Sequence, residues 1–165
     1  SSLRVPDKAL EQYLNFSTTG WSNYIEYQGD MTSGQIDACA WQTSSANNNL
    51  VLGSLPSISS SAYIVKTGDF CQVGRYAYIA TANVQRGGGS TVNIPVHRSL
   101  LTPLLSPVSA VIGEFGTTVS LGGSPYTGTT FCVILRSYPT YALIPIQNDS
   151  FIQWSGDFVA FESVV

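Results

Sequence analysis

From Gly20 onward the sequence repeats one local pattern: short segments rich in β-branched and aromatic residues alternate with clusters of Gly, Pro, Asn and Ser. Each segment has the length of a single strand, about 4–8 residues. The pattern predicts an all-β fold, an antiparallel β-sandwich of jelly-roll type. The candidate strands are residues 24–27, 36–42, 62–66, 76–84, 91–96, 108–115, 117–121, 130–137, 141–145 and 158–164.

The first twenty residues do not follow this pattern. Leu10, Tyr13 and Leu14 have helical spacing, and Asp7 is a suitable N-cap, so residues 6–16 predict a short helix. We therefore expect a helical or extended connecting segment over residues 1–20. A single β domain is expected over residues 21–165.

The charge of the chain is low. Charged residues make up 10% of the 165 residues and the net charge is −3. Phosphate recognition needs clustered Lys and Arg, whereas the seven basic residues here are scattered, so we expect no nucleic-acid partner. No apolar run approaches the roughly 20 residues of a membrane span, so we expect no membrane insertion.

Two candidate strands lack the alternation that a half-exposed strand shows. Residues 131–135 and 158–161 are almost entirely apolar. One interpretation is that one face packs on the core and the other on a neighbouring subunit. The alternative is that a loop such as residues 101–107 covers the second face.

The three cysteines are widely spaced and odd in number. Cys39, Cys71 and Cys132 form no C-x-x-C pair. We expect three buried thiols that act as small apolar residues. One disulfide plus one free thiol is the alternative.

Signals for catalysis are weak. The single histidine, His97, lies near Ser99, but no G-x-S-x-G elbow surrounds any serine. No ligand spacing for zinc or calcium occurs. Acidic pairs such as Glu26 with Asp30, or Asp37 with Glu114, arise easily by chance. We expect no enzymatic activity, no metal and no cofactor.

Aromatic residues next to amides and hydroxyls are the positive signal. A flat apolar ring combined with directional hydrogen bonds is what a sugar or protein receptor site uses. The same rings at strand ends can instead cap the core. The candidate ligand-binding residues are Trp21, Tyr24, Tyr27, Trp41 and Tyr126.

Three passages of the sequence carry a resemblance to one group of proteins. They are residues 3–7, LRVPD; residues 63–70, YIVKTGDF, with residues 73–79, VGRYAYI; and residues 151–156, FIQWSG, with the apolar segment after them. The first is similar to a segment that often precedes the terminal domain of bacteriophage tail fibres and tailspikes. The second resembles a Y-x-x-K-x-G turn followed by a G-R-containing strand of fibre tips, and the third resembles the closing strand of a tip.

The resemblance implies a receptor-binding tip at the virion surface. It implies a homotrimer, joined to other virion proteins, that attaches to a glycan or protein of the host cell. Two other functions remain open. One is a protruding or decoration domain of a viral capsid, and the other is a carbohydrate-active enzyme on a β scaffold.

Overall fold

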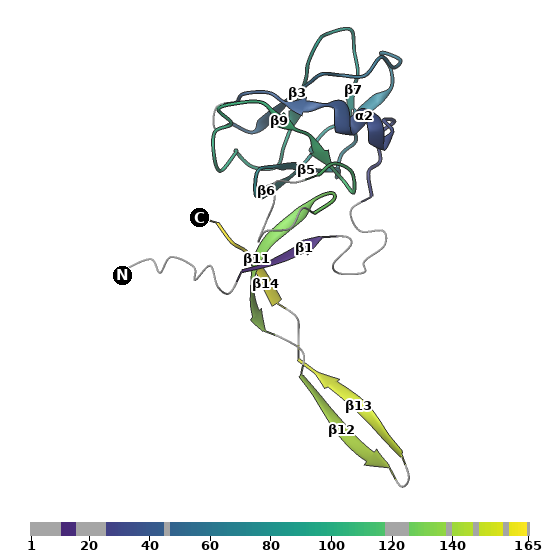
Figure 1. Ribbon diagram of the computed structural model, residues 1–165, viewed down its shortest axis with the longest axis vertical. Helices are drawn as coiled ribbons and strands as arrows, with labels where there is room; N and C mark the ends of the chain where they lie inside the picture. The colour runs from purple at the N-terminus through teal and green to yellow at the C-terminus, as the bar shows by residue number, and fades with distance from the viewer. Residues whose placement is uncertain are drawn as a thin grey trace, which may run out of the picture. The chain divides into compact units, whose positions relative to one another are not determined.

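The computed structural model describes residues 11–15, 26–44, 47–117, 126–137, 140–146, 149–156 and 159–164. The chain divides into a larger unit, Leu14–Phe131, and a smaller unit, Ser1–Tyr13 with Cys132–Val165. Antiparallel strands dominate both units (Figure 1), so the all-β prediction is confirmed. The expected boundary between residues 20 and 21 lies outside the described residues.

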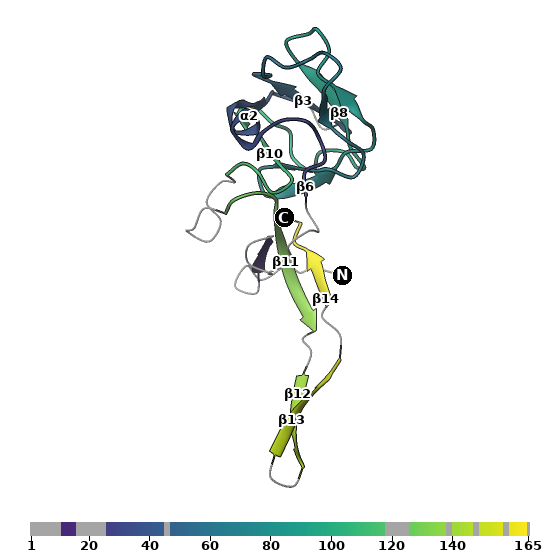
Figure 2. The same cartoon turned by 90° about the vertical axis from the view of Figure 1, so that its right-hand side faces the viewer.

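In the described part of the larger unit the strands form three antiparallel sheets. Strands of two of these sheets are labelled in Figure 2. One is a four-stranded sheet in the order β8 (Val92–Pro95), β3 (Asn49–Gly53), β2 (Ala40–Trp41) and β9 (Val108–Ser109). The second has the order β10 (Val111–Ile112), β5 (Phe70–Val73) and β6 (Tyr76–Ile79). The third pairs β4 (Tyr63–Val65) with β7 (Val84–Gln85).

Two corners connect the four-stranded sheet to the three-stranded one. Between β9 and β10 only Ala110 intervenes, and its N–H donates to the Cys39 carbonyl at 3.0 Å. At the other corner Ala80 forms a bridge with Val96 just beyond β6 and β8. Strands that pass from one sheet to the next in this way close the core on two sides.

The core of the larger unit lies between these sheets. Trp41, Leu52, Ile64, Ile94 and Ile112 are at most 1% exposed. They come from five different strands, because alternate residues of each strand face inward. The three cysteines are buried and free, which confirms the prediction of unpaired thiols.

One helix was not predicted. α2 spans Ser33–Ala38, where the sequence analysis expected residues 36–42 to begin a strand, so that part of the prediction is wrong. Thr32 and Gln35 form a capping box: the Thr32 side chain accepts from the Gln35 N–H, and the Gln35 side chain accepts from the Thr32 N–H. These two side chains satisfy N–H groups of the first turn and start the helix.

The predicted N-terminal helix is contradicted where the structure describes it. Residues Glu11–Asn15 form strand β1, which pairs with β11. The helical i, i+3, i+4 pattern spans a single turn, which is too short to stabilise a helix by itself. Pairing with a strand distant in the sequence therefore determines the structure of this segment. The predicted strand at residues 24–27 is also wrong for its described part, because residues 26 and 27 adopt no strand.

The remaining predicted strands are confirmed in outline. Residues 76–84 divide into β6 and β7, and residues 108–115 divide into β9 and β10. Three strands were not predicted from the sequence: β3, β5 and Asp149–Ser155, which is β13. Within the predicted strand 117–121, residues 118–121 lie outside the described part of the chain.

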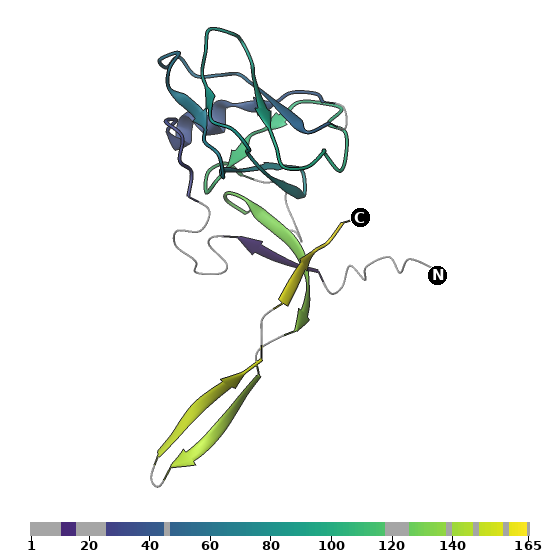
Figure 3. The same ribbon diagram turned by 180° about the vertical axis from the view of Figure 1, so that it is seen from behind.

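The smaller unit is built on β11 (Thr130–Ser137), whose first two residues belong to the larger unit. β11 lies between β1 and β14 (Val159–Glu162), with a register shift between Leu135 and Ser137. β12 (Thr140–Ile146) and β13 (Asp149–Ser155) form a separate two-stranded hairpin, visible as a long ribbon in Figure 3. Its register runs unbroken from Thr140 opposite Ser155 to Ile146 opposite Asp149.

Candidate functional site

The structure describes three of the five aromatic residues that the sequence singled out. Trp21 and Tyr24 lie outside the described residues. Trp41 is 1% exposed and its Nε1–H donates to the Gln72 carbonyl at 2.9 Å. Tyr126 is half-buried. Since the Trp41 ring has no exposed face, we assign it to the core rather than to ligand contact.

Tyr27 is also a core residue, at 9% exposure. Its hydroxyl donates to the Ile64 carbonyl at 2.5 Å and accepts the Met31 N–H at 3.3 Å. Its ring meets Phe115 edge to face, with 6.3 Å between centroids. Burial raises the pKa of Tyr27 above its usual range. The Tyr27 hydroxyl therefore holds backbone segments of the chain together rather than binding a ligand.

Three carboxylates hold the segment around Tyr27 in place. The Glu114 side chain accepts the Tyr27 N–H at 2.6 Å, and Asp69 accepts the Gln28 N–H at 3.0 Å. Asp30 accepts the Tyr63 N–H at 2.7 Å. Carboxylates that accept backbone N–H groups replace ladder hydrogen bonds. The N–H groups of Tyr27 and Gln28 are thus satisfied without a strand partner.

An exposed polar surface is formed by two adjacent loops. We call it the Ser–Gly surface. The loops are tied together by Gly87 N–H donating to the Ser60 carbonyl at 2.9 Å and by Arg86 N–H donating to the Ala62 carbonyl at 2.7 Å. Its exposed residues are Ser57, Ser59, Ser60, Ser61, Gly87, Gly88, Gly89 and Ser90.

The Arg86 side chain links the two loops of the Ser–Gly surface through hydrogen bonds. Its Nε–H donates to the Pro56 carbonyl at 2.9 Å, and its Nη1 donates to the carbonyls of Gly87 at 3.2 Å and Gly89 at 2.6 Å. One planar guanidinium thus fixes both loops at once. A charged donor holding three carbonyls makes these loops more rigid than their glycine and serine content predicts.

Ser54, at the start of the first loop, has a backbone φ of 53°. Within the described residues it is the one non-glycine residue with positive φ. This left-handed region is unfavourable for a residue with a Cβ, so the surrounding structure must hold it there. Residues held in such conformations cluster at functional sites.

Tyr63 flanks the Ser–Gly surface and supplies its aromatic component. It is half-buried, lies opposite the exposed Gln85 in the β4–β7 ladder, and carries the Lys66 ammonium 5.2 Å from its ring centroid. Tyr63 and Lys66 belong to the Y-x-x-K-x-G segment that resembles fibre tips. Neither Tyr63 nor Lys66 was among the ligand-binding residues expected from the sequence, and the fold places Tyr63 beside Ala62, whose carbonyl accepts the Arg86 N–H.

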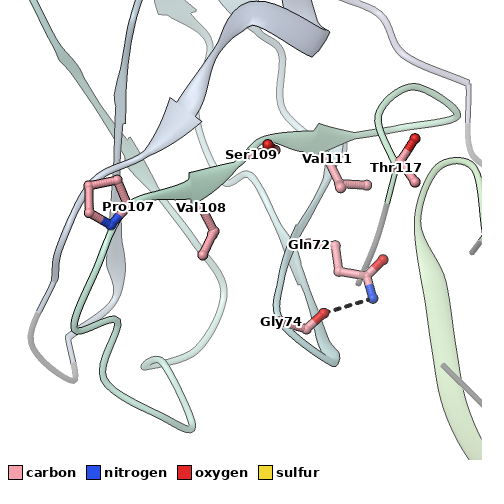
Figure 4. A pocket seen from close by; sticks show the side chains of 7 residues that line it. All are labelled: Gln72, Gly74, Pro107, Val108, Ser109, Val111 and Thr117. Atoms are coloured by element: carbon pink, nitrogen blue, oxygen red, sulfur yellow. Dashed lines mark hydrogen bonds between the residues drawn. The ribbon is translucent and has the colours of Figure 1, made fainter. Parts of the chain in front are cut away.

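A shallow pocket of about 380 Å³ lies elsewhere on the larger unit (Figure 4). Val108 and Val111 line it from β9 and β10, and Gln72 faces it from β5 (Figure 4). The Gln72 amide is already engaged: it donates to the carbonyls of Gly74 and Thr130 and accepts the Thr130 N–H at 2.7 Å. The Gln72 amide therefore stabilises the fold, and the Ser–Gly surface is the candidate site.

The residues considered for catalysis have structural partners. The Nδ1 atom of His97 accepts the Ile79 N–H at 3.0 Å, and Glu114 accepts that of Tyr27. Among the described residues no three His, Cys, Asp or Glu side chains gather closely enough to hold a metal ion.

The described part of the chain also contains no helix with the length and apolar character of a membrane span. No family model, curated protein or solved structure matches the chain.

Proposed function

We propose that this chain is the receptor-binding domain of a viral appendage, a fibre tip of a phage, and that it attaches the virion to a glycan or protein of the host surface. The Ser–Gly surface is the contact region. The proposal rests on one observation above all: Arg86 holds two exposed, hydroxyl-rich loops in a fixed arrangement on a β scaffold. Loops positioned by a rigid scaffold are where binding residues concentrate.

The chemistry of the Ser–Gly surface suits a polar ligand. Serine hydroxyls both donate and accept hydrogen bonds, and exposed glycine backbone adds donors and acceptors without steric cost. Ser59 and Ser61 already contact each other through their hydroxyls at 2.9 Å. Because the loops are ordered before contact, little conformational entropy is lost on binding. Tyr63 adds an apolar ring at the margin.

A trimer is part of the proposal. Each contact between a hydroxyl and a ligand is weak, about 0.5–1.5 kcal/mol net. Several copies that engage one cell surface together raise the avidity by about 10²–10⁴. Assembly into a homotrimer joined to other virion proteins therefore gives a weak site a useful function.

The test is binding to a panel of immobilised bacterial surface polysaccharides and to intact bacterial cells. We expect the double variant Ser59→Ala/Ser61→Ala to lose about tenfold in affinity for the ligand that the native chain binds, since two hydrogen bonds are removed. Arg86→Ala should lower the affinity further than this double variant, because the two loops lose the side chain that links them. Ser106→Ala, an exposed serine outside the surface, is the matched control.

Two results would contradict the proposal. One is binding that is equally strong in all loop variants while circular dichroism shows them folded. The other is depolymerisation of a polysaccharide that is lost on replacing an acidic pair, because this would identify an enzyme.

A further inference from the structure

We infer that the β12–β13 hairpin is an assembly element whose open edges pair with the hairpins of two other copies of this chain. The inference rests on the proposed function for the number of copies, three. It goes beyond that proposal by assigning the interface to named strands.

Exposed apolar side chains are concentrated in the smaller unit. Of the seven exposed large hydrophobic residues that the structure describes, five belong to it. They are Leu143, Ile152, Val159, Phe161 and Val164. Leu143 and Ile152 face each other across the hairpin and are 64% and 52% exposed. An apolar pair of this kind on a two-stranded ribbon is costly in water.

The hairpin also lacks support. It is about 24 Å long at 3.4 Å per residue, and a two-stranded hairpin by itself is at best marginally stable in water. No third described strand pairs with either of its edges. A long, regular hairpin is therefore expected to gain a partner that supplies a strand, because a strand pairs with the whole row of unpaired N–H and C=O groups of an edge.

The edges carry few of the features that prevent such pairing. β13 contains no Lys, Arg or Pro, and its register shows no bulge. β12 contains Pro145, next to its last residue, so the missing N–H affects only the turn end of the ladder. Monomeric proteins protect edges with charges, prolines or bulges along the strand.

The charge distribution favours a second copy of the hairpin as the partner. Asp149 is the one charged residue in β12 and β13, so the edge offers nothing for an oppositely charged protein to recognise. When β13 of one copy pairs with β12 of the next, a strand separates successive Asp149 positions by about 10 Å, near the Debye length. Parallel stacking of identical strands would instead place them about 4.8 Å apart.

Pairing of β13 with β12 of the next copy leads to a closed ring. Each copy then uses a different edge toward each neighbour, which is a heterologous contact that closes under cyclic symmetry. In a trimer the three hairpins point in the same direction, their six strands alternate in direction, and no edge remains open. A twofold pairing of β13 with β13 would leave both β12 edges exposed.

Solution mass by light scattering tests the inference on the full chain. The native chain should have three times the monomer mass of 17.7 kDa. The double variant Leu143→Asp/Ile152→Asp should become monomeric, since it places like charges in each ladder. Leu105→Asp is the matched control, because Leu105 is 87% exposed but lies in the larger unit. Far-ultraviolet circular dichroism should show that both variants remain folded.

Cysteine cross-linking tests the ring arrangement. Chains with Leu143→Cys coexpressed with chains carrying Ile152→Cys should form disulfide-linked pairs. Ile152→Cys chains that cross-link efficiently to one another would overturn the ring, because β13 would then lie beside β13. A native chain that is monomeric at micromolar concentration would overturn the whole inference.

These outcomes are distinct from the failure of the proposed function. A trimer that dissociates on hairpin substitution but binds no host surface leaves the assembly inference intact and removes the receptor-binding proposal. A monomer whose Ser–Gly variants lose binding removes the assembly inference and the trimer, but it leaves the Ser–Gly surface as the contact region.

Discussion

Asp69 is a carboxylate at 1% exposure that accepts two backbone N–H groups, from Lys66 at 2.8 Å and Gln28 at 3.0 Å. Both of its oxygens are used to hold two separate segments. Burial raises the pKa of Asp69, although these two hydrogen bonds lower it. At the residue scale, then, single side chains such as Asp69 replace strand pairing where the chain leaves the sheets.

Because the pKa of Asp69 is raised, the direction in which its contribution to stability changes with pH can be predicted. Because the folded chain binds this proton more tightly than the unfolded chain, Asp69 contributes more to stability as the pH falls from neutrality toward about 4. The difference in unfolding free energy between the native chain and Asp69→Asn should therefore increase over this range. Urea titrations at several pH values measure it. Asp37→Asn, at an exposed site, is the control for removing one negative charge.

The opposite trend, a native chain that loses stability relative to Asp69→Asn as the pH falls, would show that the hydrogen bonds outweigh desolvation at this carboxylate.

At the scale of elements, short segments depend on local side-chain hydrogen bonds. α2 has six residues and buries only Ile36, so packing contributes little to it. Its capping box supplies acceptors for N–H groups at the first turn, which the backbone of a helix cannot satisfy at any length. In the same way, Arg86 supports two loops that have no ladder of their own.

Removal of the α2 cap should be measurable. We expect Thr32→Ala to lower the free energy of unfolding by about 1 kcal/mol, because the Gln35 N–H loses its acceptor. Chemical denaturation of the full chain measures the change. Thr32→Ser keeps the hydroxyl and should retain most of the stability, whereas equal losses in the two variants would point to the methyl group instead.

For the whole molecule, the division into two units predicts unequal local stability. The larger unit has a continuous core that includes Trp41 and Ile64, whereas the smaller unit has most of the exposed apolar residues. Regions with few buried apolar contacts open at lower free energy than the core.

Native-state hydrogen exchange can test this division. We expect the amides of β3 and β5 to share one high opening free energy and those of β14 to exchange from a lower one. If the hairpin is an assembly element, the double variant Leu143→Asp/Ile152→Asp should increase the difference in opening free energy between these strands. A single opening free energy for all strands would mean that the two units unfold as one.

The sequence by itself determined the fold class and most strand positions, because β-branched and aromatic segments and the turn residues between them act locally. Only the tertiary structure decided that Trp41 is in the core, that residues 11–15 form a strand, and that Arg86 reaches Pro56, thirty residues away. Burial and long-range pairing depend on neighbours distant in the chain, which local pattern does not encode.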